Sequence, residues 1–318
     1  MEEKQKTERI ALSSRKSNVV RFTQIKPVTN IIFHLLLFAF SLMCVIPFLL
    51  VVSISLSSES SIYEYGYRLI PKTVSFEGFE YLIEQRTMIL RALGMSVLVT
   101  VLGTLIGITL NTTMGYGLSR PEYKLRKLYI WLVFIPMVFS GGLVSSYFIT
   151  SQFLHLKNTI WVLILPLSVS SFNIIICRTF FRTNIPDSVI ESAKIDGASQ
   201  FVIYFRIVLP LSLPVIATVG LFMSFGYWND WFQALLYLDN RNLYTLQALL
   251  NKILVDLQEL ANLASLLGAV SYAEQLARIP QEAARMAVVV IIVLPIACAY
   301  PFFQRYFVTG LTVGSVKG

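Results

Sequence analysis

Charged residues are scarce in this sequence, and hydrophobic residues are abundant. Asp, Glu, Lys and Arg make up 14% of the 318 residues, whereas hydrophobic residues make up 55%. This composition excludes an ordinary soluble globule and favours a chain that lies in lipid. The formal net charge of +8 does not indicate a nucleic-acid-binding protein, because the basic residues are not clustered with stacking aromatics on one module.

Residues that carry metal or redox chemistry are also few. The two histidines, His34 and His155, lie near opposite ends of different apolar segments, which favours interfacial or packing roles. The cysteines stand singly, without CxxC spacing or a neighbouring histidine pair, as is typical of small buried hydrophobic residues. They are Cys44, Cys177 and Cys298. We therefore expect neither a metal site nor a disulfide framework.

Catalytic motifs are missing as well. The sequence contains no GxxxxGK[ST] phosphate-binding loop, so any ATP that the protein uses must be bound by a partner. No Ser-His-Asp set and no membrane-embedded pair of carboxylates can be assembled. We predict that the chain is not an enzyme, has no catalytic residue and binds no cofactor of its own.

Long apolar segments dominate what is present. Backbone polar groups in a bilayer must be satisfied internally, so segments of this length are expected to cross it as helices. The second segment carries Gly103 and Gly107 at a spacing that suits close helix packing. The sequence thus predicts an all-α, polytopic membrane protein with six transmembrane helices. Their approximate ranges are 29–56, 89–113, 128–150, 159–181, 208–228 and 286–303.

A further apolar pattern, between residues 246 and 257, does not count as a seventh span. Its leucines and isoleucine repeat at helical spacing on one face, while charged residues occupy the other. Each charge would cost roughly 2.5–3.5 kcal/mol at the centre of a membrane helix. We therefore predict an interfacial or docked helix. The charged residues are Lys252, Asp256 and Glu259.

The distribution of basic residues predicts the topology. With six spans, one side of the membrane receives 17 of the 26 Lys and Arg residues. The positive-inside rule places that side, with both termini, in the cytoplasm. The predicted parts are a basic N-terminal segment (1–28), a membrane domain (29–307) and a cytoplasmic tail (308–318). Within the membrane domain, a cytoplasmic elbow spans about 184–206 and an extracytoplasmic connection spans about 231–285.

The elbow is a polar island between two apolar segments. We expect Asn184 to cap a short helix that has Pro186 and Asp187 in its first turn. Gly197 suits a left-handed helix end, and Ser199 can cap the next helix. The elbow is therefore predicted to be two short helices joined at a glycine.

One face of the first elbow helix is nearly free of side-chain bulk. Val189, Ala193 and Gly197 are spaced four apart, so they share a face that another helix or a groove could approach closely. Glu191 and Asp196 add charge at its rims. Glu191 has a purely structural alternative, which is to close a capping box with Ser188 and stabilise the helix by about 1 kcal/mol.

These elbow residues resemble a known motif. The runs 191–193 and 196–198, followed by Phe205, Leu209 and Pro210, are similar to the cytoplasmic EAA coupling loop of binding-protein-dependent ABC importer permeases. Ser192 departs from the alanine usual there but is nearly isosteric with it. The runs 140–143, 227–232 and 300–310 bring the resemblance closer to the sugar-importer branch. It implies the type I importer fold and an ATPase-coupling role for Glu191, Ala193, Asp196, Gly197 and Ala198.

The resemblance also implies partners and a function. In that family the chain would be one permease of an ATP-driven importer of the bacterial cell membrane for sugars, with oligosaccharides as the expected cargo. It would pair with a second homologous permease, a homodimer of ATP-binding subunits that hold ATP and Mg²⁺, and an extracytoplasmic solute-binding protein. Two alternatives stay open: a permease of the same fold for a non-sugar solute, and a membrane-embedded enzyme.

Residues of the substrate path are harder to select. Asn173 lies within the fourth apolar segment, where an amide is at least as suited to bonding a neighbouring helix. Tyr227, Trp228 and Asn229 could stack on and bond to a sugar, but aromatic residues at the end of a span ordinarily form an interfacial belt. We carry all four as candidates for substrate contact.

Overall fold

The computed structural model describes residues 27–267 and 280–313. Most of the predicted N-terminal segment, part of the connection at 231–285 and residues 314–318 of the tail therefore lie outside the described residues. Within the described ranges the chain is helical, and its one strand-like feature is an isolated bridge between Ser57 and Val74. The predicted all-α class is confirmed. In chain order the elements are α2 (Pro27–Ser55), α3 (Glu59–Tyr65), α4 (Glu77–Glu84), α5 (Arg86–Ser119), α6 (Arg126–Val138), α7 (Leu143–Phe148), η1 (Ile149–Phe153), α8 (Trp161–Ser168), α9 (Ser171–Asn184), α10 (Asp187–Ile195), α11 (Gln200–Val202), η2 (Ile203–Val208), α12 (Leu209–Leu211), α13 (Leu213–Asn229), α14 (Phe232–Tyr237), η3 (Arg241–Leu243), α15 (Leu246–Leu267) and α17 (Gln281–Val313).

Six parts of the described chain are long and apolar enough to cross a membrane, provided that a bent helix pair counts as one span. Three are unbroken helices: α2, α5 and residues Gln281–Cys298 of α17. The others are bent: α6 meets α7 and η1 at 117°, α8 meets α9 at 47°, and Gln200–Leu211 meets α13 at 82°. Each of the six predicted segments coincides with one of these parts.

The three bent spans differ from the unbroken helices that were predicted, and the third differs most. A single helix over about 128–150 was expected, but α6 ends at Val138 and α7 begins at Leu143. Gly142, which precedes α7 as its N-cap, adopts a φ of +82°, a conformation that favours glycine. The prediction of one continuous third helix is therefore wrong.

Helix α5 lies at the centre of the bundle and packs against α13, α9 and α8. Two of its glycines make this possible. A Cβ atom at Gly103 would overlap the ring of Tyr227, and one at Gly107 would overlap the end of Met223, both of which belong to α13. The close packing predicted from the spacing of these glycines is confirmed.

The amphipathic segment forms α15, which packs on α5 and α17. Leu246, Leu249 and Leu250 are at most 3% exposed, and Lys252 pairs with Asp256 at 2.6 Å. The prediction of a docked helix is confirmed.

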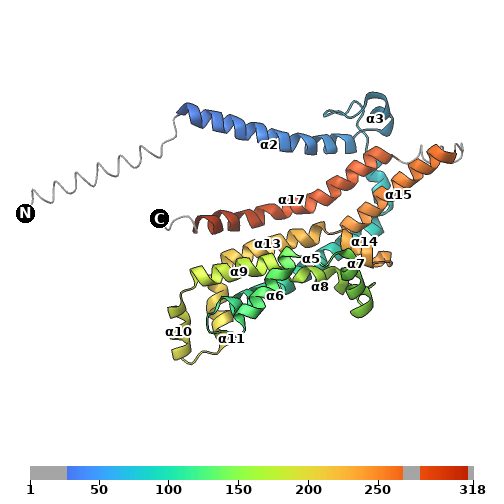
Figure 1. Ribbon diagram of the computed structural model, residues 1–318. Coiled ribbons are helices and arrows are strands. Elements are labelled where there is room, and N and C mark those ends of the chain that lie inside the picture. Colours follow the sequence, from blue (N-terminus) through green and yellow to red (C-terminus); the bar gives the residue numbers. More distant parts are fainter. Residues whose placement is uncertain (1–26, 268–279, 314–318) are drawn as a thin grey trace, which may run out of the picture.

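The two long outer helices, α2 and α17, run beside each other (Figure 1). None of the most apolar 18-residue window of α2 is buried within the chain, so this helix offers its side chains to lipid or to another protein. Helix α17 continues to Val313, beyond the predicted start of the tail at residue 308. Elements α10 and α11 stand at one end of the bundle, and α3, α14 and α15 gather at the other (Figure 1).

Candidate coupling site

The first elbow helix, α10, starts and ends at residues that suit its dipole. Pro186 occupies the N-cap position with φ −60° and ψ 139°, Asp187 lies in the first turn and Lys194 in the last. The predicted cap is wrong. Asn184 is the last residue of α9, and its Nδ2 donates to the carbonyl of Phe180 at 3.2 Å. The extended conformation that proline imposes on the preceding residue separates the two helices.

Helix α10 ends at Ile195, and Gly197 forms the left-handed turn just beyond it, as predicted. This glycine has a φ of +79°. Its N–H donates to the carbonyl of Lys194, and the N–H of Ala198 donates to the carbonyl of Ala193, each at 3.0 Å. These two bonds form a Schellman motif, which satisfies carbonyls that the helix end would otherwise leave unpaired. A Cβ at Gly197 would have nothing within 4 Å. Glycine is therefore favoured by the backbone conformation and not by a lack of space for a side chain within this chain.

The small side chain of Ala193 lies within the chain's own core. It is 8% exposed and belongs to a buried cluster with Ile190, Ile203 and Tyr204. The predicted bare face is thus divided, because Gly197 is exposed while Ala193 packs inward. A role for Ala193 in contacting a partner stays a prediction.

The acidic residues of the elbow face solvent. Glu191 and Asp196 are both exposed. The capping-box alternative for Glu191 requires Ser188 at the N-cap, but Pro186 occupies that position without a side-chain cap bond. The prediction that Ser199 caps the next helix is confirmed, since its Oγ accepts the N–H of Val202 at 3.4 Å.

Large apolar side chains are exposed on the elbow. Ile195 is 86% exposed, Phe201 is 77% exposed and Phe205 is 57% exposed. Such side chains on a polar island next to a helix end are typical of a surface that another protein covers.

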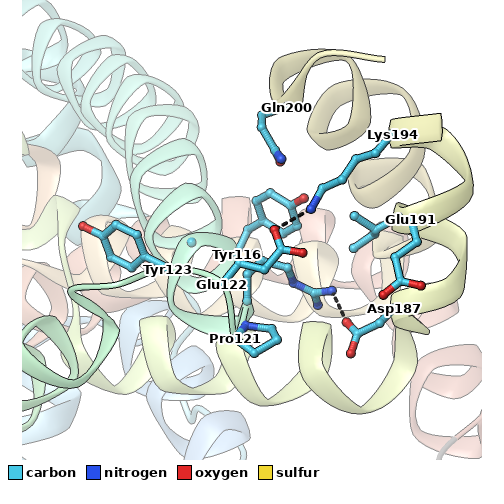
Figure 2. Close-up of a pocket in the computed structure, with 11 residues that line it drawn as sticks. Tyr116, Pro121, Glu122, Tyr123, Asp187, Glu191, Lys194 and Gln200 are labelled. Carbon is cyan, nitrogen blue, oxygen red and sulfur yellow. Dashed lines mark hydrogen bonds and ion pairs between the residues drawn. The ribbon is translucent and has the colours of Figure 1, made fainter. Parts of the chain in front are cut away.

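Two ion pairs anchor α10 to the segment that follows α5, as Figure 2 shows. Arg120 bonds to Asp187 at 2.9 Å, and Lys194 bonds to Glu122. Exposed pairs of this kind each contribute about 0–1 kcal/mol. Arg120 does more, because its side chain is only 12% exposed and its Nη2 also donates to the carbonyl of Phe181 at 2.9 Å.

A pocket of about 290 Å³ lies between these anchored segments (Figure 2). Its wall carries acidic and basic side chains from both sides. In the described part of the chain, no group of three or more His, Cys, Asp or Glu residues is arranged to hold a metal ion. The pocket is lined by Tyr116, Gly117, Arg120, Pro121, Glu122, Tyr123, Asp187, Ile190, Glu191, Lys194 and Gln200.

The second elbow helix is anchored to α5 as well. Tyr204, in the π-helical turn η2, has its hydroxyl 2.8 Å from Oγ1 of Thr112 and 3.2 Å from Oγ1 of Thr113. Its ring lies 5.4 Å from that of Tyr116, centroid to centroid. Both halves of the elbow therefore contact the same end of α5.

The four candidates for substrate contact do not share one environment. Tyr227 is 2% exposed, and its hydroxyl donates to the carbonyl of Ile164 at 2.8 Å, inside the bundle. Asn173, in the first turn of α9, is 7% exposed. Asn229 is exposed at the end of α13, and its Nδ2 donates to the carbonyl of Phe225 at 3.0 Å. The structure thus gives Tyr227 a packing role.

Trp228 lines a second, almost wholly apolar cavity of about 540 Å³ between α5, α13 and α17. Its indole Nε1 is buried without a hydrogen-bond partner in the described part of the chain. Thr100 lines the same cavity.

Sequence reasoning missed the residues that hold the elbow. Arg120 counts only among the basic residues that predict the topology, and Tyr204 belongs to no predicted motif. Their partners are 67 and 92 residues away in sequence, so no local pattern reports them. Ile195 left a weak signal, as an isolated apolar residue between Lys194 and Asp196.

The fold and the site together define a multi-pass α-helical membrane protein with a helical elbow anchored at one end of its bundle. The family model of the binding-protein-dependent transport system inner membrane components matches residues 28–313. The chain belongs to this family. It is a transport permease of a bacterial membrane, not an enzyme, and the resemblance inferred from the elbow motif is confirmed.

Relatives in Bacillus subtilis (strain 168) match nearly the whole chain. The polygalacturonan/rhamnogalacturonan transport system permease protein YtcP is 38% identical over 293 residues, which cover 91% of this chain and 99% of the relative. Protein LplC is 38% identical over 274 residues, 86% of this chain and 90% of the relative. The arabinooligosaccharides transport system permease protein AraQ is 27% identical over 284 residues, 89% of this chain and 92% of the relative.

A solved structure has the same fold. It is described as a bacterial ABC transporter involved in the import of the acidic polysaccharide alginate. It is similar with a TM-score of 0.77 and 24% sequence identity, over 90% of this chain and 100% of the matched chain. At this identity the similarity establishes the type I importer permease fold alone.

Proposed function

We propose that this chain is one permease of an ATP-driven importer for oligosaccharides. It pairs with a second homologous permease, with two copies of an ATP-binding subunit and with an extracytoplasmic binding protein that delivers the sugar. The ATP-binding subunits hold ATP and Mg²⁺. The present chain supplies half of the transmembrane path and the elbow that these subunits move.

The cargo is inferred from the relatives. YtcP is named for polygalacturonan and rhamnogalacturonan, and AraQ is named for arabinooligosaccharides. These sugars differ in their units, but each is a chain of linked sugars. We therefore infer an oligosaccharide as the cargo. A permease for a non-sugar solute is the second candidate, because the elbow relates to the ATPase and not to the cargo.

The proposed orientation places the elbow and both chain termini in the cytoplasm. The side that holds the elbow receives most of the Lys and Arg residues, as the positive-inside rule requires. Elements α3, α14 and α15, at the other end of the bundle, then face outward and offer a surface to the binding protein (Figure 1).

One observation supports the coupling role: the elbow is exposed to solvent on one side and bonded to the end of α5 on the other. Ile195 and Phe201 are exposed, next to the acidic Glu191 and Asp196, and they form the surface for an ATP-binding subunit. Arg120 fixes the elbow to α5. Movement of the docked subunits therefore displaces α5 together with the elbow.

Such coupling requires a difference in contact between two states. Closure of the ATP-binding dimer favours the permease conformation to which its closed form binds better, and hydrolysis removes that preference. The closed dimer favours the outward-open cavity, which receives the sugar. Hydrolysis then returns the cavity to the inward-open state.

The candidates for sugar contact keep separate proposed roles. Asn229, exposed at the outward end of α13, is the candidate we propose for contact with sugar as it enters, whereas Trp228 beside it is buried and lines the apolar cavity. Tyr227 and Asn173, both buried, contribute by holding α13 and α9 in position.

The experiment that tests this proposal is the ATPase activity of the complex, reconstituted in lipid with its co-encoded partners. The binding protein is loaded from a panel of oligosaccharides, amino acids, peptides and inorganic anions. We expect stimulation by an oligosaccharide and by no non-sugar solute. Stimulation by a non-sugar solute alone would reject the sugar cargo and leave the importer class in place. A complex without any ATP-binding subunit would reject the importer.

A further inference from the structure

The fourth span is broken where an unbroken helix was predicted. Helix α8 ends at Ser168 and α9 begins at Ser171, and the two axes differ by 47°. Val169 and Ser170 between them are extended, with φ near −120°. A break of this kind leaves carbonyls of the first helix and N–H groups of the second without helical partners. In a membrane each such group is costly unless protein satisfies it.

A single side chain of α5 binds both sides of this break. Asn111 is fully buried. Its Nδ2 donates to the carbonyl of Ser168 at 2.8 Å, and its Oδ1 accepts the N–H of Ser170 at 3.0 Å. Nδ2 also donates to the carbonyl of Gly107 within α5, at 2.7 Å. The amide thus replaces helical bonds lost at the break with bonds to α5.

The chemistry of this bridge calls for an amide. One end must donate and the other must accept, and both must stay uncharged in an apolar setting. Leucine has a similar size but neither function. Serine is too short to reach both backbone groups from α5.

The residues that follow Asn111 hold the elbow. Thr112 and Thr113 bind the hydroxyl of Tyr204. One turn of α5 therefore contacts the break in the fourth span and the second elbow helix. At its end, α5 is tied to α9 again, since Nε of Arg178 donates to the carbonyl of Leu118 at 3.3 Å.

We propose that Asn111 is a positioning residue for transport, which ties the break of the fourth span to α5 so that α5, α8, α9 and the elbow move as one body. The inference rests on the proposed function in one respect, namely that an ATP-binding subunit displaces the elbow. Without the amide bridge, the elbow and α5 would move while the fourth span lags behind.

The test uses the complete complex in lipid and whichever solute stimulates the wild type. Stimulated ATPase activity is measured against the concentration of loaded binding protein for wild type and for Asn111→Leu. We expect Asn111→Leu to reduce the maximal stimulation about tenfold, from the two unsatisfied backbone groups. The unstimulated ATPase activity and the half-saturating concentration of binding protein stay unchanged, because the variant impairs a step that follows docking of the binding protein.

Matched variants separate positioning from general damage. Thr109→Val lies two residues away on α5 and removes a hydroxyl bond made only within the helix, to Leu105, so it should behave as wild type. If Asn111→Leu does not assemble, Asn111→Ser replaces it, with the same expected loss. Tyr204→Phe removes the hydroxyl that joins the second elbow helix to Thr112 and Thr113 of α5. If Tyr204 and Asn111 act in the same coupling step, the double variant should keep as much stimulated ATPase activity as the less active of the two single variants.

The outcomes distinguish this inference from the proposed function. Full stimulation of Asn111→Leu and Asn111→Ser, in a complex whose wild type responds to a solute, would overturn the role of Asn111 and leave the importer assignment standing. Additive losses in the double variant, or a shift of the half-saturating concentration alone, would also overturn it. If only a non-sugar solute stimulates the wild type, the proposed cargo fails and the test of Asn111 proceeds with that solute.

Discussion

The left-handed turn at Gly197 gives the sharpest prediction about the elbow. Two explanations of this glycine make opposite predictions. In the first, the backbone conformation requires it, because the φ of +79° is unfavourable for residues with a Cβ. In the second, a docked partner needs the absence of side-chain bulk there. The φ of Gly197 supports the first explanation, and the open space around it, where a Cβ would have nothing within 4 Å in this chain, leaves room for the second.

Three substitutions separate the two explanations. Alanine adds the least bulk but has a left-handed penalty of about 1–2 kcal/mol, whereas asparagine is larger and tolerates this conformation better. A penalty of that size changes the balance between the formed and the frayed turn by about 5- to 30-fold. We therefore expect coupling to fall in the order Gly197, Gly197→Asn, Gly197→Ala and Gly197→Val, the β-branched residue being the most strained.

The assay is the ratio of stimulated to unstimulated ATPase activity in the assembled complex, with yield and melting temperature as controls for folding. If Gly197→Ala retains more coupling than Gly197→Asn, the backbone explanation is refuted and bulk at a docking surface is favoured. Equal loss in all three variants would contradict both the graded penalty and the Schellman geometry.

Four further substitutions test the packing and the anchors. Arg120→Lys keeps the charge but cannot bond to Asp187 and to the main chain at once, so we expect about a tenfold loss of stimulated ATPase activity with little change in melting temperature. Gly107→Ala should lower the melting temperature by overlapping Met223, and Met223→Ala in the same chain should restore part of it, as a thermal melt of the complex would reveal. Tyr227→Phe removes one buried hydrogen bond and should cost about 0.5–1.5 kcal/mol of stability without changing the half-saturating concentration of the binding protein.

Local sequence patterns predicted much of the fold. Apolar length predicted the six spans, the glycine spacing predicted the approach of α13 to α5, and the two-faced pattern at 246–257 predicted a docked helix. The left-handed Gly197 and the cap at Ser199 also followed from local chemistry. Each of these features depends on residues within a few turns of one another.

Features that depend on distant contacts were missed or misjudged. The cap assigned to Asn184 failed because Pro186 itself takes the N-cap position. The inward packing of Ala193 depends on Ile203 and Tyr204, which come back to α10 only after the turn. The amide of Asn111 gave no signal, because its partners lie 57 and 59 residues further along the chain.

We propose that an ATP-binding subunit engages the elbow through its exposed apolar side chains. The most direct measurement is co-purification of that subunit with Ile195→Asp and Phe201→Asp variants. Ile70→Asp is the matched control, since Ile70 is 81% exposed in the segment between α3 and α4. We predict that both elbow variants lose the ATP-binding subunit while Ile70→Asp retains it. Retention of that subunit and of stimulated ATPase activity by both elbow variants would contradict the claim.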